Sequence, residues 1–164
     1  MSDPGLEKVS NRLLSNLAED ELVQRVINHL RQQLIVDRVV LYYFYRQWEG
    51  RVTFESLSSD DYSILGSTGP DECFNGEYAA LYQNGRIRAI ANIETASIAE
   101  CHREFLRKMQ VKANLIVPVL PSNNLWGLLV AHHCQGPVDW SPDRIQAMKL
   151  GAKTLAQSET IRDS

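Results

Sequence analysis

Three short segments of this 164-residue chain hold the side chains best suited to chemistry. They contain Asp71 and Cys73 in "DECF", Cys101 with His102, and the run His132-His133-Cys134. A thiolate is a nucleophile and a metal ligand, an imidazole exchanges protons near neutral pH, and an ionised carboxylate accepts hydrogen bonds. These residue types therefore raise three options: a reactive thiol, a disulfide and a metal site.

The spacing disfavours both a zinc site and Cys–His catalysis. Zinc sites usually contain close ligand pairs, and here only "HHC" is clustered. Successive strand residues point to opposite faces, so His132 and His133 would not both face one ion. Neighbours on a helix, such as Cys101 and His102, point about 100° apart, which is poor geometry for a nucleophile and its base. We therefore expect no metal ligand, no catalytic residue and no enzyme.

Each candidate residue also has a simpler interpretation. Cys101 is either a small buried residue or, beside Glu100 and Arg103 near a helix start, a thiol with a lowered pKa. Asp71 could be an aspartate that stabilises a turn. His102 could be a solvated histidine on a helix, and His133 could be a histidine in the core near the end of a strand. A Cys73–Cys101 disulfide is geometrically feasible, although a reducing cytosol would not maintain it.

Composition narrows the class of protein. The chain is 44% hydrophobic and 23% charged, with a net charge of −3, so it lacks the basic face that nucleic-acid binding needs. It shows no signal peptide and no apolar stretch long enough to span a bilayer. The chain has three cysteines, an odd number, and their spacing is not that of a disulfide framework, which fits a protein of a reducing compartment. We expect a cytoplasmic domain without direct membrane contact, although a longer parent protein could be anchored elsewhere.

Periodicity predicts one α+β domain. Helical spacing of apolar residues covers 19–34, 77–83 and 97–109, and a last helix begins with Ser141 as N-cap and Pro142 after it. Strand-like segments are 37–46, 49–57, 86–93, 112–120 and 125–133, with a long loop over 58–76. This order indicates an antiparallel central sheet between helices, and a loop of that length is usually functional.

Five segments in this order resemble the GAF domain of cyanobacteriochromes, bilin-binding photoreceptors related to phytochromes. They are "DRVVLYYFY", "DECF", "GRIRAIANI", "CHREFLRKMQVKANLIVPVL" and "LWGLLVAHHCQGPVDW". The resemblance covers about residues 20–158 and implies the GAF fold: α/β (α+β), with an antiparallel sheet of about five to six strands and the terminal helices packed on one side. It divides the chain into an N-terminal extension (1–18), a bilin-binding GAF domain (19–160) and a tail (161–164) leading to an output domain.

"DECF" resembles the D-x-C-F motif of the dual-cysteine subfamily, and the separation of 28 residues between Cys73 and Cys101 is similar too. The resemblance implies a covalently bound linear tetrapyrrole, phycocyanobilin and/or phycoviolobilin. Cys101 would form a permanent thioether at ring A, and Cys73 would add reversibly to the bridge carbon between the two middle rings. Light would drive 15Z/15E isomerisation, coupled to this second bond. The only chemistry of the protein itself would be autocatalytic attachment and conversion of phycocyanobilin to phycoviolobilin.

The colour change follows from the chemistry of that addition. A thiol added at the central bridge makes the carbon sp³ and divides the conjugated system in two. Shorter conjugation raises the excitation energy, so the adduct should absorb violet or blue light. The form without the adduct should absorb at longer wavelength, in the green or teal. Glu72, Met109 and His133 depart from residues common in the subfamily, which leaves the exact colours open.

The resemblance also implies roles around the pigment. Asp71 would accept hydrogen bonds from the pyrrole N–H groups, and His102 would lie against the rings. Arg86 or Arg88 would hold a propionate; we expect only one to face inward and favour Arg86. Further pocket residues would be Tyr78, Tyr82, Phe74 and His133, the last reaching ring D or a propionate from the sheet. Cys134 is expected to be a structural thiol at a strand end.

The remaining expectations concern partners and alternatives. The longer protein would carry a kinase, cyclase or chemotaxis-type output domain, and a homodimer would form through the terminal helices. In one alternative the chain is a GAF domain that binds a non-covalent ligand such as a cyclic nucleotide. In another it is a redox sensor that uses a Cys73–Cys101 disulfide and needs no pigment. Fold alone does not decide among these functions.

Overall fold

The computed structural model of the chain describes residues 4–46, 49–69 and 76–164, without the side chains of residues 4–10 and 76–78. Its centre is a five-stranded sheet with the order β2-β1-β5-β4-β3, in which every neighbouring pair is antiparallel. The strands are β1 (Arg38–Arg46), β2 (Glu49–Leu57), β3 (Arg88–Ile90), β4 (Ala113–Val119) and β5 (Gly127–His133). The predicted antiparallel sheet of five to six strands is confirmed.

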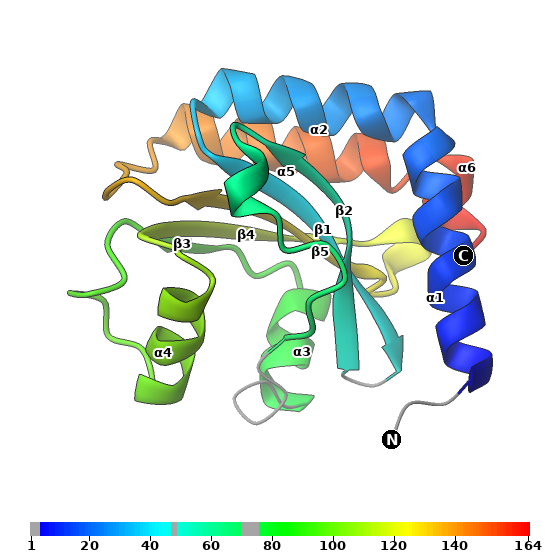
Figure 1. The fold of residues 1–164 in the computed structure, drawn as a ribbon, viewed down its shortest axis with the longest axis horizontal. Helices are drawn as coiled ribbons and strands as arrows, with labels where there is room; N and C mark the ends of the chain where they lie inside the picture. The colour runs from blue at the N-terminus through cyan, green and yellow to red at the C-terminus, as the bar shows by residue number, and fades with distance from the viewer. Residues whose placement is uncertain (1–3, 47–48, 70–75) are drawn as a thin grey trace.

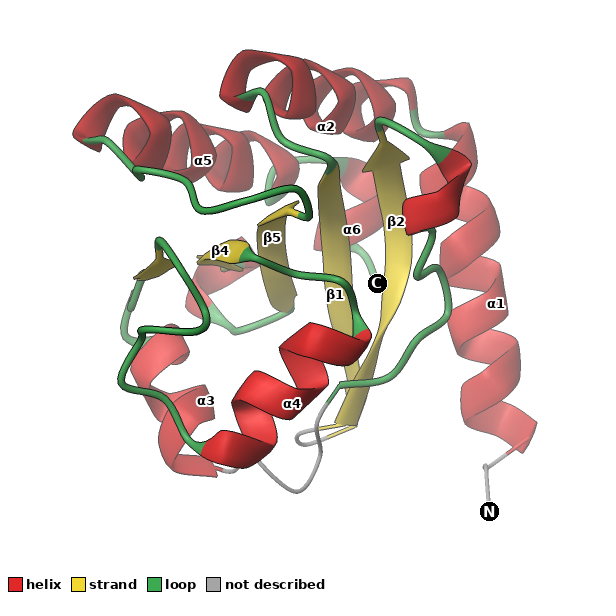
Figure 2. Cartoon of the chain, turned by 60° about the vertical axis from the view of Figure 1, so that its left-hand side comes forward, coloured by secondary structure: helices red, strands yellow, loops and turns green. Residues whose placement is uncertain are grey.

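Helices cover both faces of the sheet (Figure 1). The helices are α1 (Pro4–Glu19), α2 (Glu21–Leu34), α3 (Gly76–Gln83), α4 (Glu100–Lys108), α5 (Pro142–Leu155) and α6 (Glu159–Arg162). α2 and α5 lie side by side on one face, whereas α3 and α4 lie on the other, as the turned view also shows (Figure 2). Within the described part of the chain, none of the helices has the length and apolar character needed to cross a bilayer.

Alternation along the strands separates two apolar layers. In β1, Val39 and Leu41 face α2 and α5, while Val40 and Tyr42 face the side of α3 and α4. The first layer forms the main core with the buried stripe of α2 and with Met148 of α5. The second layer is thinner, because α3 and α4 are short and stand apart from each other. This thinner layer leaves room for a cavity.

Local capping signals set several helix boundaries. The side chain of Asp20 accepts hydrogen bonds from the backbone N–H groups of Leu22 and Val23, so α2 begins at Glu21, two residues later than predicted. The predicted start of the last helix is confirmed, since Ser141 accepts from the N–H of Arg144 and Pro142 is the first residue of α5. The predicted loop over 58–76 contains a short 3₁₀ helix, Asp60–Tyr62.

The segment expected to be an extension, residues 1–18, contains most of α1. Leu13 and Leu17 lie one helical turn apart on α1, and both are buried in the main core. The described side chains of this segment, from residue 11 onward, therefore pack as part of the folded unit.

Candidate ligand-binding site

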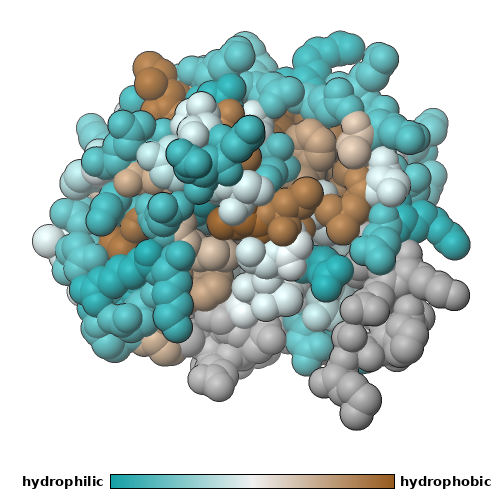
Figure 3. Space-filling view, viewed as in Figure 1, coloured by the Kyte–Doolittle hydropathy of each residue, from teal (hydrophilic) through white to brown (hydrophobic). Residues whose placement is uncertain are grey.

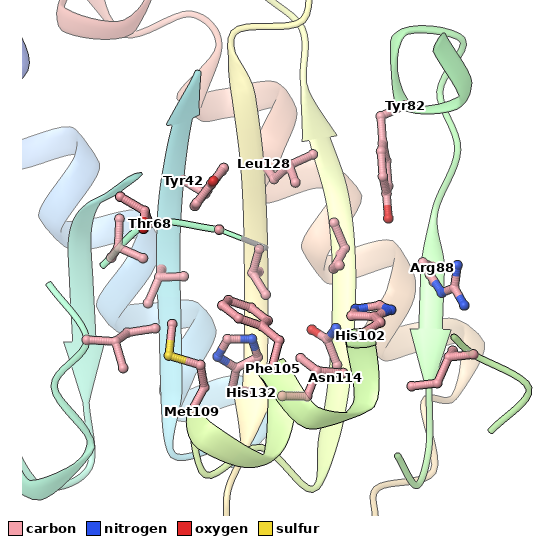
Figure 4. Close-up of a pocket in the computed structure, with 18 of the residues that line it drawn as sticks. Tyr42, Thr68, Tyr82, Arg88, His102, Phe105, Met109, Asn114, Leu128 and His132 are labelled. Carbon is pink, nitrogen blue, oxygen red and sulfur yellow. The ribbon is translucent and has the colours of Figure 1, made fainter. Parts of the chain in front are cut away.

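A cavity of about 360 Å³ lies on the face of the sheet that carries α3 and α4. Its floor is formed by alternate residues of three central strands, which project from the sheet toward the viewer in Figure 4. The apolar members of this floor are Val40, Ile116, Leu128 and Val130. The surface view shows apolar side chains gathered near the middle of one face, within a mostly hydrophilic rim (Figure 3). Largely apolar cavities with a few polar groups are typical of small-molecule sites.

One face of α4 forms a side wall of the cavity. His102, Phe105 and Met109 follow helical spacing and all line it. Cys101 is exposed in the first turn of α4, between Ala99 and His102, which both line the cavity. A group attached to Cys101 would therefore start at the rim. In this structure Cys101 is disulfide-bonded.

His102 is a neutral ring at physiological pH. Burial, followed by the charge of Arg88, lowers the pKa of His102 from 6.5 to about 4. The ring and the Arg88 guanidinium lie near each other at one end of the cavity (Figure 4). The simpler interpretation, a solvated helix histidine, is therefore wrong, because the helix turns this residue toward the sheet and into the cavity lining, where the expected role against the pigment rings would require it.

Arg86 and Arg88 both line the cavity, so the expectation that only one faces inward is wrong. Residues two apart in an extended chain point to the same side, which is the physical reason. The guanidinium of Arg86 lies over the ring of Tyr82, with its central carbon 5.8 Å from the ring centroid. Tyr82 is buried and lines the cavity as predicted. Two cations in the lining suit a ligand with two carboxylates.

The histidine that β5 directs into the cavity is His132, not His133. Strand alternation turns His133 to the opposite face, where its Nδ1 lies 3.2 Å from Oδ2 of Asp37. The expectation that His133 reaches the pigment from the sheet is thus corrected. The choice of face depends on the register of β5 against β4, in which His132 lies opposite Asn114. The sequence alone does not give this register.

Sequence reasoning also missed two buried polar residues beside His132. Arg38 is fully buried and donates from Nε to Nδ1 of His132 over 3.0 Å. Asn114 is 1% exposed and lines the cavity, and its Oδ1 accepts no hydrogen bond from the described residues. An unsatisfied buried acceptor is costly, so Asn114 is suited to a ligand that brings a donor.

The other predicted site residues cannot be placed in the same way. Asp71, Cys73 and Phe74 lie outside the described residues, and so does the side chain of Tyr78, whose backbone belongs to α3. Cys134 is a free, buried cysteine. No group of three or more potential metal ligands occurs within the described ranges.

Comparison with known proteins was consistent with this geometry. The model of the GAF domain family matches residues 18–158. An uncharacterised protein of Picosynechococcus sp. is 44% identical over 163 residues, which cover 99% of this chain and all of that protein. A putative methyl-accepting chemotaxis protein of Synechocystis sp. is 35% identical over 140 residues, which cover 85% of this chain but 14% of that protein.

Solved structures show the same similarity. The cyanobacteriochrome receptor PixJ superposes with a TM-score of 0.75 at 31% identity, over 85% of this chain and 94% of that one. The phycocyanobilin-bound GAF domain of a cyanobacterial phytochrome superposes with a TM-score of 0.75 at 26% identity, over 98% and 97% of the two chains. The match to the family model spans most of the sequence, and so the chain belongs to the GAF domain family.

Proposed function

We propose that this GAF domain is a photosensory module that covalently holds a linear tetrapyrrole in the cavity between the sheet and α4. The observation that carries the proposal is the position of Cys101 at the rim of an apolar cavity that Arg86 and Arg88 also line. The similarity to a phycocyanobilin-bound domain and to a cyanobacteriochrome supports it. The pigment is phycocyanobilin and/or its isomer phycoviolobilin.

The residues of the cavity fit such a ligand. A linear tetrapyrrole has apolar rings, pyrrole N–H donors, terminal carbonyl acceptors and two propionates. Arg86 and Arg88 supply planar guanidinium groups for the propionates. Asn114 Oδ1 supplies an acceptor that no described residue satisfies. His102, held neutral, lies in the cavity wall without adding a further positive charge beside Arg88.

Attachment is redox-neutral once Cys101 is a thiol. The sulfur of Cys101 bonds to a carbon of the ring A side chain, a carbon–carbon double bond becomes single, and the thiol proton moves to the adjacent carbon. A thiol reductant must first open the disulfide of Cys101 with two electrons and two protons. The start of α4 assists, because a helix N-terminus stabilises a thiolate.

Cys73 and Asp71 complete the proposal as the photochemical pair. Bound pigment supplies light absorption and 15Z/15E isomerisation. Cys73 adds its sulfur to the central bridge carbon and gives its proton to the conjugated system, which converts a green- or teal-absorbing state to a violet- or blue-absorbing one. Asp71 accepts from the pyrrole N–H groups. An output domain in a longer protein, as in the chemotaxis relative, would receive the signal, with dimerisation through the terminal helices.

A redox sensor is the second candidate, and the disulfide at Cys101 is the observation that favours it. In that function Cys73 and Cys101 would cycle between dithiol and disulfide with a thiol–disulfide partner, and no pigment would be needed. A non-covalent ligand, such as a cyclic nucleotide, is the third candidate and would use the cavity without either thiol.

The test is co-expression of the domain with the enzymes of phycocyanobilin synthesis, under thiol reduction. Zinc-induced fluorescence on a denaturing gel reports covalent attachment, and absorbance before and after blue light reports switching. Wild type is compared with Cys73→Ala and Cys101→Ala. Cys134→Ala is the matched control, because it removes a buried thiol outside the cavity.

Fluorescence that requires Cys101 but survives Cys134→Ala, with a violet or blue band that Cys73→Ala abolishes, would support the full proposal. Colour that does not depend on Cys73 would reduce it to a single-cysteine photoreceptor. A colourless wild type, with bilin supplied and thiols reduced, would sink the photoreceptor proposal. Titration of the Cys101 thiol in redox buffers would then test the sensor.

A further inference from the structure

Arg38 is the only charged side chain among the fully buried large residues of the described chain. Its Nη1 donates to the carbonyl of Tyr62 and its Nη2 to the carbonyl of Met109, each over 2.6 Å. Its Nε donates to Nδ1 of His132 over 3.0 Å. One guanidinium thus joins β1 to β5, to the 3₁₀ helix and to the end of α4. Burial lowers the pKa of Arg38, and the charges of Glu55 and Asp37 oppose this effect through space.

The direction of the hydrogen bond to His132 determines where that ring carries its proton. A guanidinium has five N–H donors and no acceptor, so the atom it contacts must offer a lone pair. Nδ1 of His132 is therefore unprotonated, and a neutral ring must carry its proton on Nε2. Burial and the adjacent Arg38 charge both lower the pKa of His132, which keeps the ring neutral.

We infer that Arg38 is a positioning residue that holds His132 as the Nε2–H tautomer, so that a fixed hydrogen-bond donor lies in the cavity wall. His132 lies opposite Asn114 in the β4–β5 register, and both residues line the cavity. The wall therefore offers a donor from His132 beside Oδ1 of Asn114, an acceptor that no described residue satisfies. The tautomer is a property of the protein without ligand, and only its effect on a pigment rests on the proposed function.

The same contacts connect the donor to two further walls of the cavity. The Met109 carbonyl follows the last turn of α4, which also carries Phe105, and Tyr62 belongs to the 3₁₀ helix between β2 and the cavity residues Ile64 and Thr68. A lysine has a single point of donation on a flexible stem and cannot reproduce three fixed contacts. Arg38 therefore fixes both the His132 ring and its distance from these walls.

The first experiment uses the protein without pigment. Long-range ¹H–¹⁵N correlation spectra of the histidine rings at neutral pH distinguish the two neutral tautomers and the cation. The His132 signals are assigned by their loss in His132→Gln. We expect wild-type His132 to show a single neutral tautomer with the proton on Nε2. A proton on Nδ1, or a doubly protonated ring, would overturn the inference whatever the variants do.

The second experiment compares Arg38→Met and Arg38→Lys with a control, Arg31→Met. Arg31 also donates from Nε to a single side chain, Ser56, but it lies on α2, on the other side of the sheet. We expect Arg38→Met to give a mixture of the two tautomers of His132 and Arg31→Met to leave the wild-type pattern. An unchanged tautomer in a folded Arg38→Met protein contradicts the positioning role. If Arg38→Met does not fold, the ring spectra of the wild type and of Arg38→Lys still test the positioning role of Arg38.

The third experiment loads the same proteins with bilin. We expect Arg38→Lys to keep covalent fluorescence on a denaturing gel but to shift the long-wavelength absorption band, because the donor beside the pigment is no longer fixed. An unshifted band with an altered tautomer would show that this donor does not contact the pigment. If no variant and no wild type takes up bilin, the proposed function fails, whereas the ring spectra still test Arg38.

Discussion

Asp37 and His133 form a polar pair on the face of the sheet opposite the cavity, with Oδ2 and Nδ1 3.2 Å apart. Each is the chain neighbour of a member of the Arg38–His132 pair on the cavity side. Asp37 is 2% exposed, and it accepts hydrogen bonds from the backbone N–H of Cys134 and from the side chains of Gln135 and Ser58. It thus ties the start of β1 to the end of β5.

Replacing Asp37 with asparagine should destabilise the fold. Asparagine keeps one acceptor but removes the charge and faces at least one donor with its own amide N–H₂. Hydrogen bonds to a charged group contribute about 1.5–3 kcal/mol each, so we expect a loss of roughly 2–3 kcal/mol in the free energy of unfolding. Urea unfolding measures it. Asp139→Asn, at an exposed position, is the control and should stay close to wild type.

Because the Asp37 carboxylate stabilises the fold in its charged form, we expect the stability of the protein to fall at acid pH. Backbone and side-chain donors outweigh the opposing effect of burial and lower the pKa of Asp37 below 3.8. A lowered pKa means that the stabilisation is complete above the unfolded value and is lost as the pH falls through the folded one. The wild type should therefore be more stable than Asp37→Asn at neutral pH, and this difference in the free energy of unfolding should disappear below about pH 4. A constant difference between the two proteins down to pH 2 would contradict this.

His102 predicts a second pH effect with a different window. Its pKa falls from 6.5 to about 4 on folding, so between these values the unfolded chain binds more protons than the folded one. The free energy of unfolding of the pigment-free protein should decrease as the pH is lowered from 6.5 to 4. His102→Gln should reduce this slope, and His29→Gln, at an exposed position on α2, should keep it. Urea titrations at several pH values give the slopes.

Two glycines should respond differently to alanine. A Cβ at Gly127 would overlap the backbone carbonyl oxygen of Tyr42 in the neighbouring strand, and a backbone atom within a sheet cannot move aside. We expect Gly127→Ala to cost about 3 kcal/mol. A Cβ at Gly151 would lie 2.6 Å from Cδ1 of Leu30, the flexible end of a side chain.

In Gly151→Ala, the higher helix propensity of alanine, about 1 kcal/mol, offsets the local repacking. Thermal or urea unfolding should therefore show that Gly127→Ala is clearly less stable than Gly151→Ala. Equal destabilisation would mean that the close approach of β1 and β5 at Gly127 is not as described.

Cys134 should be unreactive in the folded protein. Its thiol is buried, and burial raises its pKa, so both access and thiolate content are low. Alkylation at neutral pH followed by mass spectrometry should label Cys134 only after unfolding. Rapid labelling of the native protein would show that the end of β5 opens, and Leu155→Ala, which weakens the main core, serves as a positive control for opening.

Local signals in the sequence were sufficient for the sheet and the principal helices. Ser141 with Pro142 marks a helix start through contacts within one turn, and the apolar period of α2 and of the strands is equally local. On α4 the sequence pointed to His102 through the family resemblance, whereas Phe105, which also lines the cavity, was not singled out.

Features that depend on distant contacts were missed or misassigned. The partners of Arg38 lie 94, 24 and 71 positions away, so no local pattern marks it as buried. His132 and His133 are indistinguishable by type, and only the pairing of β5 with β1 and β4 selects which one faces the cavity. A one-residue shift of that pairing would exchange them.

Among the described residues, the sheet separates the cavity from the layer of α2 and α5, and at the end of β5 this separation is one peptide unit thick. A ring that faces the cavity, His132, is joined through a single amide to a ring that contacts Asp37 on the other side. The polar contacts on the two faces of the sheet are therefore joined within β5 by one peptide bond, and this connection does not pass around the edge of the sheet.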